Sequence, residues 1–290
     1  MNDFVVFILT HGRADNVITY RTLKKAGYTG RIVIVIDNED KQRPQYIENF
    51  GAENVAIFSK DEEAKKFDEI VKGDRRTIVY ARNACFGIAE KLGYRYFLEL
   101  DDDYSFFGYN VDNQYKWVVR TMNCSNLNDV FSAILHYFKN TPTITSLALS
   151  QGGDFIGGAE HLKSISMTRK CMSSFFCDTQ RPFKFQGRIN EDVNTYTTLA
   201  TRGVVFFTLM QFSLNQKTTQ SNKGGMTDVY LDSGTYLKSF FTIITHPSGC
   251  KIALMGGKNK RLHHSIAWNN TAPKIINEKY KKHGEQKSKS

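Results

Sequence analysis

The sequence predicts an α/β fold: a mixed, mainly parallel sheet flanked by helices in a Rossmann-like arrangement, forming a single domain. Strand and helix signals alternate through the first hundred residues, which is typical of parallel strands joined by helical crossovers. Several of the apolar strands end in polar or acidic residues. The 290 residues are 41% hydrophobic and include only five prolines, which excludes disordered, collagenous and coiled-coil chains and allows a substantial core.

The expected strands are short runs of apolar, mostly β-branched or aromatic residues, at 4–9, 31–36, 55–58, 96–100, 144–149 and 204–209. The expected helices have apolar residues at intervals of three and four. One carries Val17, Ile18 and Leu23 and ends before Gly27, and two more are expected at 77–92 and 127–138. Right-handed crossovers leave the carboxyl ends of consecutive strands on one edge of the sheet. That edge would collect loop 10–13, Asp37 and Asp101–Asp103. The polar stretch 215–225 is expected to be a functional or mobile loop.

The charge is unevenly distributed along the chain. The net charge of +10 divides into −1 over residues 1–145 and +11 over residues 146–290, so we expect the second half to meet a polyanion. The five cysteines are scattered and form no CxxC pair, which favours free thiols in a reducing compartment. The N-terminal apolar run is too short to span a membrane and lacks signal-peptide flanks, so the expected location is the cytoplasm.

Three acidic residues in a row, Asp101–Asp103, follow the strand at 96–100. Carboxylates at positions i and i+2 of a turn can share one hard divalent cation such as Mn²⁺ or Mg²⁺, which relieves their mutual repulsion. A solvated acidic turn is the alternative. Arg82, on the helix before this strand, faces the sheet and needs an anionic partner. Either an internal ion pair with these aspartates or the diphosphate of a ligand would satisfy it.

These motifs together resemble the GT-A fold of nucleotide-sugar glycosyltransferases. The resemblance implies that Asp101 and Asp103 hold the metal on the diphosphate of the donor and that Asp37 contacts its nucleoside. The residues implied to bind the nucleotide sugar are Thr10, Gly12, Arg13, Asp37, Arg82, Asp101 and Asp102.

Two later segments are also similar to GT-A elements. Glu191-Asp192 resembles the acidic pair that supplies the catalytic base of inverting enzymes, with Asp192 as the base and Glu191 as the fallback. The pattern alone is equally typical of acids that cap a helix start. His263 and His264 are similar to the segment in which a histidine completes the metal shell, although a histidine pair by itself is usually an ordinary loop feature.

Over its whole length the chain resembles the phage TET-associated glycosyltransferases, which attach sugars to 5-hydroxymethylpyrimidines in DNA. The segments that carry this likeness are residues 222–228, 233–240, 245–248 and 263–268. The implied reaction moves a sugar from a UDP-sugar to 5-hydroxymethylcytosine in DNA with inversion, in the cytoplasm of the host. The acceptor nucleotide is expected to flip out of the duplex.

The implied organisation is a nucleotide-sugar-binding part at 1–110, an acceptor-binding and catalytic part at 111–278, and a basic tail at 279–290. The basic residues expected to contact DNA phosphates are Lys163, Arg169, Lys170, Arg181, Lys184 and Arg188. Three other functions stay open: a GT-A transferase acting on a glycan, lipid or protein, a two-metal nucleotidyltransferase, and an inactive nucleic-acid-binding module.

Overall fold

The computed structural model describes residues 2–66, 75–151, 168–216, 226–255 and 261–273. Nine strands form one sheet in the order β3-β2-β1-β4-β8-β7-β9-β5-β6, and two more form a separate hairpin, β10-β11. The strands are β1 Phe4–Leu9, β2 Ile32–Asp37, β3 Val55–Phe58, β4 Tyr96–Asp101, β5 Tyr104–Val111, β6 Trp117–Asn123, β7 Ile144–Ser150, β8 Ser174–Asp178, β9 Val205–Gln216, β10 Cys250–Met255 and β11 Arg261–Ile266. The helices are α1 Ile18–Lys25, α2 Arg43–Phe50, α3 Lys60–Lys65, α4 Val79–Lys91, α5 Leu127–Asn140, α6 Glu191–Ala200, α7 Met226–Thr245 and α8 Trp268–Thr271, with a 3₁₀ turn at Ala52–Asn54.

The sheet is mixed, and this confirms the predicted class. β1, β2, β3 and β4 run parallel to one another, and β7 is parallel to β9. β8 is antiparallel to β4 and β7, and β5 is antiparallel to both β6 and β9. The continuous apolar runs of β1 and β2 suit strands that are covered on both faces.

Helices cover both faces of this sheet. Alternate residues of a strand point to opposite faces, and β1 therefore contributes to two cores. Phe4, Val6 and Ile8 pack with residues of α1, α2 and α5, whereas the residues between them pack with α4 and α6. No side chain of β1 is more than 2% exposed. This two-sided burial fixes the position of the β1 carboxyl end, where the 10–13 loop begins.

The division expected at residue 110 falls inside one sheet. β5 crosses that position and pairs with β9 and β6, so the two expected parts share a continuous sheet. The helix expected at 77–92 is α4, and the strand expected at 204–209 continues to Gln216 as part of β9. The tail at 279–290 and positions 217–225 of the expected loop lie outside the described residues. No helix in the described part of the chain is long and apolar enough to cross a membrane.

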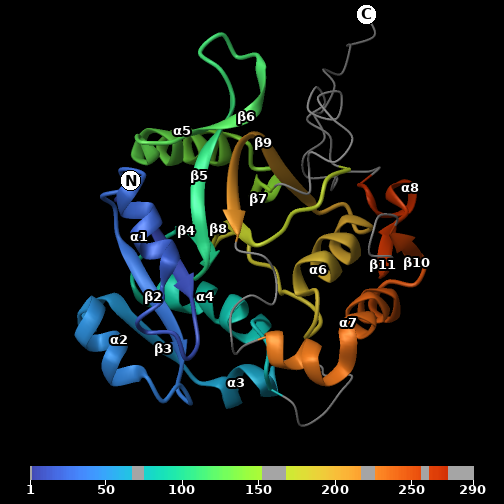
Figure 1. The fold of residues 1–290 in the computed structure, drawn as a ribbon, viewed down its shortest axis with the longest axis horizontal. Helices are drawn as coiled ribbons and strands as arrows, with labels where there is room; N and C mark the ends of the chain where they lie inside the picture. Colours follow the sequence, from blue (N-terminus) through green and yellow to red (C-terminus); the bar gives the residue numbers. More distant parts are fainter. Residues whose placement is uncertain (1, 67–74, 152–167, 217–225, 256–260, 274–290) are drawn as a thin grey trace, which may run out of the picture.

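The site lies where the early strands end. The register pairs Leu9 with Asp101, so the residues that follow β1 and β4 are neighbours. On another side of the molecule, α6, α7 and the β10-β11 hairpin gather around the later strands (Figure 1). The carboxyl edge predicted from the sequence is therefore present, and the C-terminal elements lie around the start of α6.

Candidate active site

Asp102 fixes the loop that follows β1. Thr10 Oγ1 donates a hydrogen bond to Asp102 Oδ2 at 2.6 Å, and an Arg13 guanidinium nitrogen donates to Asp102 Oδ1 at 2.9 Å. Asp102 is 3% exposed, and both of its oxygens are engaged within the protein. Asp102 therefore holds the 10–13 loop in place through its two carboxylate oxygens.

Two residues that sequence reasoning missed complete this loop. The backbone N–H of Gly12, whose φ is +66°, donates to Asp40 Oδ2 at 2.8 Å. The hydroxyl of Tyr46, which is fully buried, accepts from the backbone N–H of Arg13 at 2.8 Å and lies 3.1 Å from Thr10 Oγ1. The only available signal was that Asp40 and Tyr46 follow the second strand of the same sheet edge.

Asp37, at the end of β2, is paired with two cationic side chains. His11 Nδ1 lies 2.7 Å from Asp37 Oδ2, and Lys60 Nζ lies 3.6 Å from the same oxygen. Burial raises the pKa of Asp37, but the hydrogen bond with His11 and the charge of Lys60 outweigh it and leave the pKa lowered. The hydrogen bond with Asp37 raises the pKa of His11. Asp37 is thus an ionised group at the place that the sequence predicted, with His11 as an additional polar group that it did not predict.

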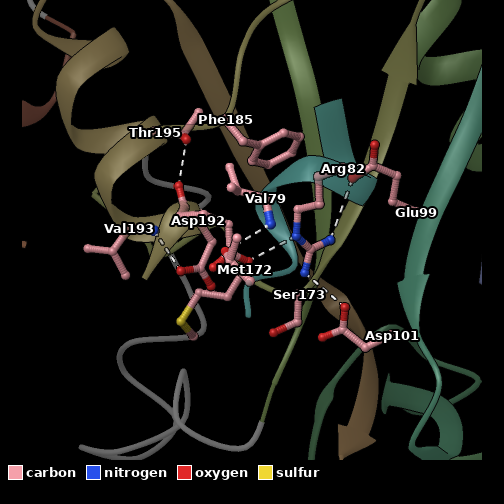
Figure 2. Close-up of polar contacts among 12 residues, drawn as sticks. Val79, Arg82, Glu99, Asp101, Met172, Ser173, Phe185, Asp192, Val193 and Thr195 are labelled. Atoms are coloured by element: carbon pink, nitrogen blue, oxygen red, sulfur yellow. Dashed lines mark hydrogen bonds and ion pairs between the residues drawn. The ribbon is translucent and has the colours of Figure 1, made fainter. Parts of the chain in front are cut away.

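Arg82 is buried among three carboxylates from different elements. Its Nε donates to Glu191 Oε1 at 2.9 Å, and one terminal nitrogen donates to Asp101 Oδ1 at 2.9 Å. The other terminal nitrogen lies 3.5 Å from Glu99 Oε2. Figure 2 shows the guanidinium pointing toward Asp101 and Glu99, with Asp192 on its other side. Arg82 is 1% exposed, and the internal ion pairs with Asp101, Glu99 and Glu191 supply the anionic partners that the sequence required.

The carboxylates around Arg82 outnumber it. Burial raises the pKa of Glu99 to about 8 against the opposing charge of Arg82. Burial also raises the pKa of Asp101 to about 7, again against Arg82, and the charges of Asp103 and Glu191 add to that effect. One guanidinium therefore compensates this acidic group incompletely, and further positive charge would stabilise it.

Asp103 has the oxygen best placed for that further charge. Its Oδ1 is buried and has no hydrogen-bond partner, while Oδ2 accepts from Gln216 Nε2 at 3.5 Å. Burial and the charge of Asp102 raise its pKa. An unpaired carboxylate oxygen beside Asp101 fits a hard cation. Among the described residues, however, no three or more His, Cys, Asp or Glu side chains form a metal-binding group, so the structure does not bring His263 or His264 to these aspartates.

Glu191 and Asp192, the two acids at the start of α6, have different environments. Glu191 is buried and held by Arg82, whereas Asp192 is partly exposed. Burial raises the pKa of Asp192 to about 6, and the charge of Glu191 contributes. Asp192 Oδ1 accepts from the backbone N–H of Val193 at 2.7 Å. Asn190, the residue at the helix N-cap, makes no capping hydrogen bond with its side chain. Of the two acids, Asp192 is the more accessible to a bound molecule.

His264, on β11, has cationic surroundings. It is 4% exposed, and neither ring nitrogen has a hydrogen-bond partner. Burial lowers its pKa to about 3, and the charges of Lys170, His263 and Lys238 add to this. Positive neighbours oppose the binding of a divalent cation. The environment of His264 is therefore different from that of Asp101 and Asp103.

The expected DNA-contacting residues have different environments. Arg181 is paired with Asp178, with its Nε 3.0 Å from Oδ2, and it also donates to the backbone carbonyls of residues 138, 141 and 144. Arg188 is 4% exposed. Arg181 is thus engaged within the protein, and little of Arg188 reaches the surface. Arg169 and Lys170 are half-buried and Lys184 is exposed, whereas Lys163 lies outside the described residues.

A family comparison identifies the chemistry of this chain. The model of the TET-Associated Glycosyltransferase family matches residues 4–225, which include the 10–13 loop, Arg82, Asp101–Asp103 and Asp192. The chain belongs to this family. This TET-associated glycosyltransferase is therefore a sugar-transferring enzyme, and the family match ends before α7. No curated protein matches the sequence at a significant level.

Several solved structures are similar at low identity. S. aureus TarS 1–349 shares 12% identity over 75% of this chain and 61% of its own, with a TM-score of 0.44. Glucosyl-3-phosphoglycerate synthase from Mycobacterium tuberculosis, solved with Mg²⁺ and UDP, shares 9% identity over 91% of this chain and 87% of its own, with a TM-score of 0.45. Mannosyltransferase PcManGT from Pyrobaculum calidifontis, solved with GDP-Man and Mn²⁺, shares 12% identity over 77% of this chain and 58% of its own, with a TM-score of 0.45. The matched region spans less than two thirds of the TarS chain.

Proposed function

We propose that this glycosyltransferase moves a sugar from a UDP-sugar to the hydroxyl of 5-hydroxymethylcytosine in DNA, with Mn²⁺ or Mg²⁺ at Asp101 and Asp103. The observation that carries the proposal is the buried, unpaired Oδ1 of Asp103 beside Asp101, whose pKa is raised to about 7. A bound cation would supply charge neutralisation for the leaving diphosphate. Membership of the family supports sugar transfer, and the positive second half of the chain supports a polyanionic acceptor.

The residues of the chain have separate tasks in this reaction. Asp37 and the 10–13 loop hold the nucleoside, because they form an ordered polar surface at the ends of β1 and β2. Arg82 touches no substrate; it orients Asp101 and Glu191 through its two 2.9 Å contacts. Positioning by such fixed side chains lowers the entropic cost of bringing the reactants together.

Asp192 is the base in this proposal. As the acceptor hydroxyl oxygen forms its bond to the anomeric carbon, the bond from that carbon to the diphosphate oxygen breaks. The hydroxyl proton passes to a carboxylate oxygen of Asp192, and the nucleoside diphosphate departs with the electron pair. A base with a pKa of about 6 is mostly ionised at neutral pH and still accepts a proton in the transition state. Attack from the face opposite the diphosphate inverts the anomeric centre.

The test is transfer from a panel of nucleotide sugars to hydroxymethylated and unmodified DNA. We expect labelled sugar on the hydroxymethylated DNA alone, dependent on added Mn²⁺ or Mg²⁺. Asp103→Ala should abolish transfer while leaving the unfolding midpoint near that of wild type, and Asp129→Ala, an exposed acid on α5, is the matched control. Transfer to a glycan, lipid or protein acceptor but not to DNA would reject the acceptor, and full activity of Asp103→Ala at saturating Mn²⁺ would reject the metal assignment.

A further inference from the structure

His264 is a buried polar side chain that the protein leaves without a partner. It is 4% exposed on β11, and both ring nitrogens lack hydrogen bonds. In the hairpin it lies opposite Ile252, on the strand that packs along α7. A neutral imidazole has one N–H donor and one acceptor, and buried groups of this kind are normally bonded. An incomplete donor at this place indicates that a ligand completes it.

Two lysines from other elements lie close to this histidine. On α7, Ser239 Oγ donates to the carbonyl of Leu262 at 3.2 Å, which brings neighbouring Lys238 alongside β11. Lys170 precedes β8, and its positive charge acts to lower the pKa of both His264 and Cys250, which lie near one another on the hairpin. The carbonyl of Lys170 accepts from Thr208 Oγ1 at 2.9 Å, so its backbone is fixed to β9.

The same group of residues adjoins the proposed base. Asn190 Nδ2 donates to the carbonyl of Lys238 at 2.7 Å and to Thr242 Oγ1 at 2.9 Å, which ties α7 to the start of α6. Asp192 lies two residues after Asn190, and the charge of Lys238 acts on it. The backbone of Lys238 is therefore bonded to the residue before the acidic pair, and its charge acts on both Asp192 and His264.

We infer that Lys170, Lys238 and His264, here termed the basic cluster, form a phosphate-binding site beside Asp192. Two ammonium groups and one imidazole N–H make a donor set that suits phosphate oxygens, whereas a divalent cation would meet like charge. Lys238 and His264 lie beyond residue 225, where the family match ends. Two of the three residues of the basic cluster thus lie outside the region that the family match covers.

The position of the basic cluster favours a phosphate of the acceptor strand, and this choice of source rests on the proposed function. The cluster adjoins the base that faces the acceptor hydroxyl, whereas Asp37 and His11 lie at the ends of β1 and β2. The diphosphate of the donor offers the same chemistry, so the experiment must separate the two sources.

The experiment measures binding, which does not depend on sugar transfer. Lys170→Gln and Lys238→Gln in the full chain are compared with Lys251→Gln, an exposed lysine of β10, using pyrophosphate, UDP with Mn²⁺, and a short unmodified DNA single strand. Each cluster variant should weaken DNA binding. It should also reduce the slope of log affinity against log salt concentration by about 0.7 in magnitude, the value for one single-strand phosphate contact. The control should behave as wild type. Unfolding curves confirm that each variant is folded.

The outcomes separate the sources and can overturn the inference. Loss of DNA affinity with unchanged UDP and pyrophosphate affinity identifies the acceptor strand, and loss of UDP and pyrophosphate affinity identifies the donor diphosphate. Unchanged affinity for all three probes in both lysine variants would overturn the site. If wild type transfers no sugar to hydroxymethylated DNA but the variants lose phosphate affinity, the proposed function fails while the basic cluster stands.

Discussion

The 10–13 loop and the basic cluster lie on two sides of one site and differ in how their polar groups are satisfied. In the loop, Thr10, Gly12 and Arg13 each bond to a side chain from another element of the protein. In the basic cluster, His264 is buried with two unpaired ring nitrogens. The loop is assembled before any substrate binds, whereas His264 has no hydrogen-bond partner among the described residues. A site of this kind would hold one substrate on a fixed surface and recognise the other by charge.

Arg82 lies between these two regions. Its contacts with Asp101 and Glu191 join the acidic turn after β4 to the start of α6, where Asn190 bonds to α7. The guanidinium also lies over the ring faces of Phe175 and Phe185, at 5.2 and 5.6 Å from their centroids. These contacts exclude water, so the ion pairs have little alternative solvation.

The largest effect on stability is expected from removing the Arg82 guanidinium. Arg82→Met leaves three buried carboxylates without their cation, and breaking a buried ion pair from one side costs about 3–5 kcal/mol. Urea unfolding at pH 7 should show this loss in the free energy of unfolding. Arg95→Met is the matched control, because the Arg95 side chain is 45% exposed and its partner Asp178 keeps Arg181. Equal losses in the two variants would show that Arg82 does not hold the regions together.

The second effect concerns Asp192 and sharpens the contrast between the two sides. Asp192→Asn should reduce turnover by about 10²–10⁴-fold, the usual contribution of a general base, with little change in donor affinity. Wild-type transfer should also fall as pH drops through about 6, where Asp192 takes up a proton. Pre-steady-state transfer and UDP binding measure the two quantities, with Asp129→Asn as the control. Parallel losses in turnover and donor affinity would make Asp192 a structural residue.

The sequence was informative for the parallel half of the sheet and less so beyond it. β1, β2, β3 and β4 are continuous apolar runs, because helices cover both of their faces, and the expected bounds agree within about a residue. Several elements were not predicted, namely α2, α3, β5, β6, β8, α7, α8 and the β10-β11 hairpin. β8 has five residues, and the hairpin depends on packing against α7. Elements held by tertiary contacts have weak local signals.

The site shows the same division. Asp37, the acidic turn and Glu191-Asp192 were found because each follows an element boundary that the pattern reveals. His11, Asp40, Tyr46 and Glu99 were missed, because their roles arise from partners 26 to 36 residues away or, for Glu99, from burial inside a strand. Charge type alone also did not reveal that Arg181 is paired with Asp178 or that Arg188 is buried, since a sequence does not show which arginines have internal partners.

The third prediction tests how firmly the 10–13 loop is held. Tyr46→Phe removes the oxygen that accepts from the Arg13 N–H at 2.8 Å, and a buried unpaired donor costs about 1–3 kcal/mol. Thermal unfolding should show the loss, and UDP affinity should fall with it. The control is Tyr20→Phe, since the Tyr20 ring packs on Phe50 and its hydroxyl makes no hydrogen bond among the described residues. Unchanged stability in Tyr46→Phe would mean that Asp102 and Asp40 hold the loop without Tyr46.

The smallest effect is the pH dependence of the pair formed by His11 and Asp37. The pKa of His11 is raised in the folded protein, so its contribution to stability is complete below the unfolded value of 6.5 and is lost as pH rises through the folded pKa. The His11 side chain is 48% exposed, and solvent screening limits the contribution to on the order of a few tenths of a kcal/mol. His11→Gln should remove this part of the stability profile, which declines as pH rises above about 6.5, and His136→Gln, exposed on α5, should retain it. Identical profiles for all three proteins would show that the pair is too well hydrated to stabilise the fold, and that the ordering of the loop comes from Asp102, Asp40 and Tyr46.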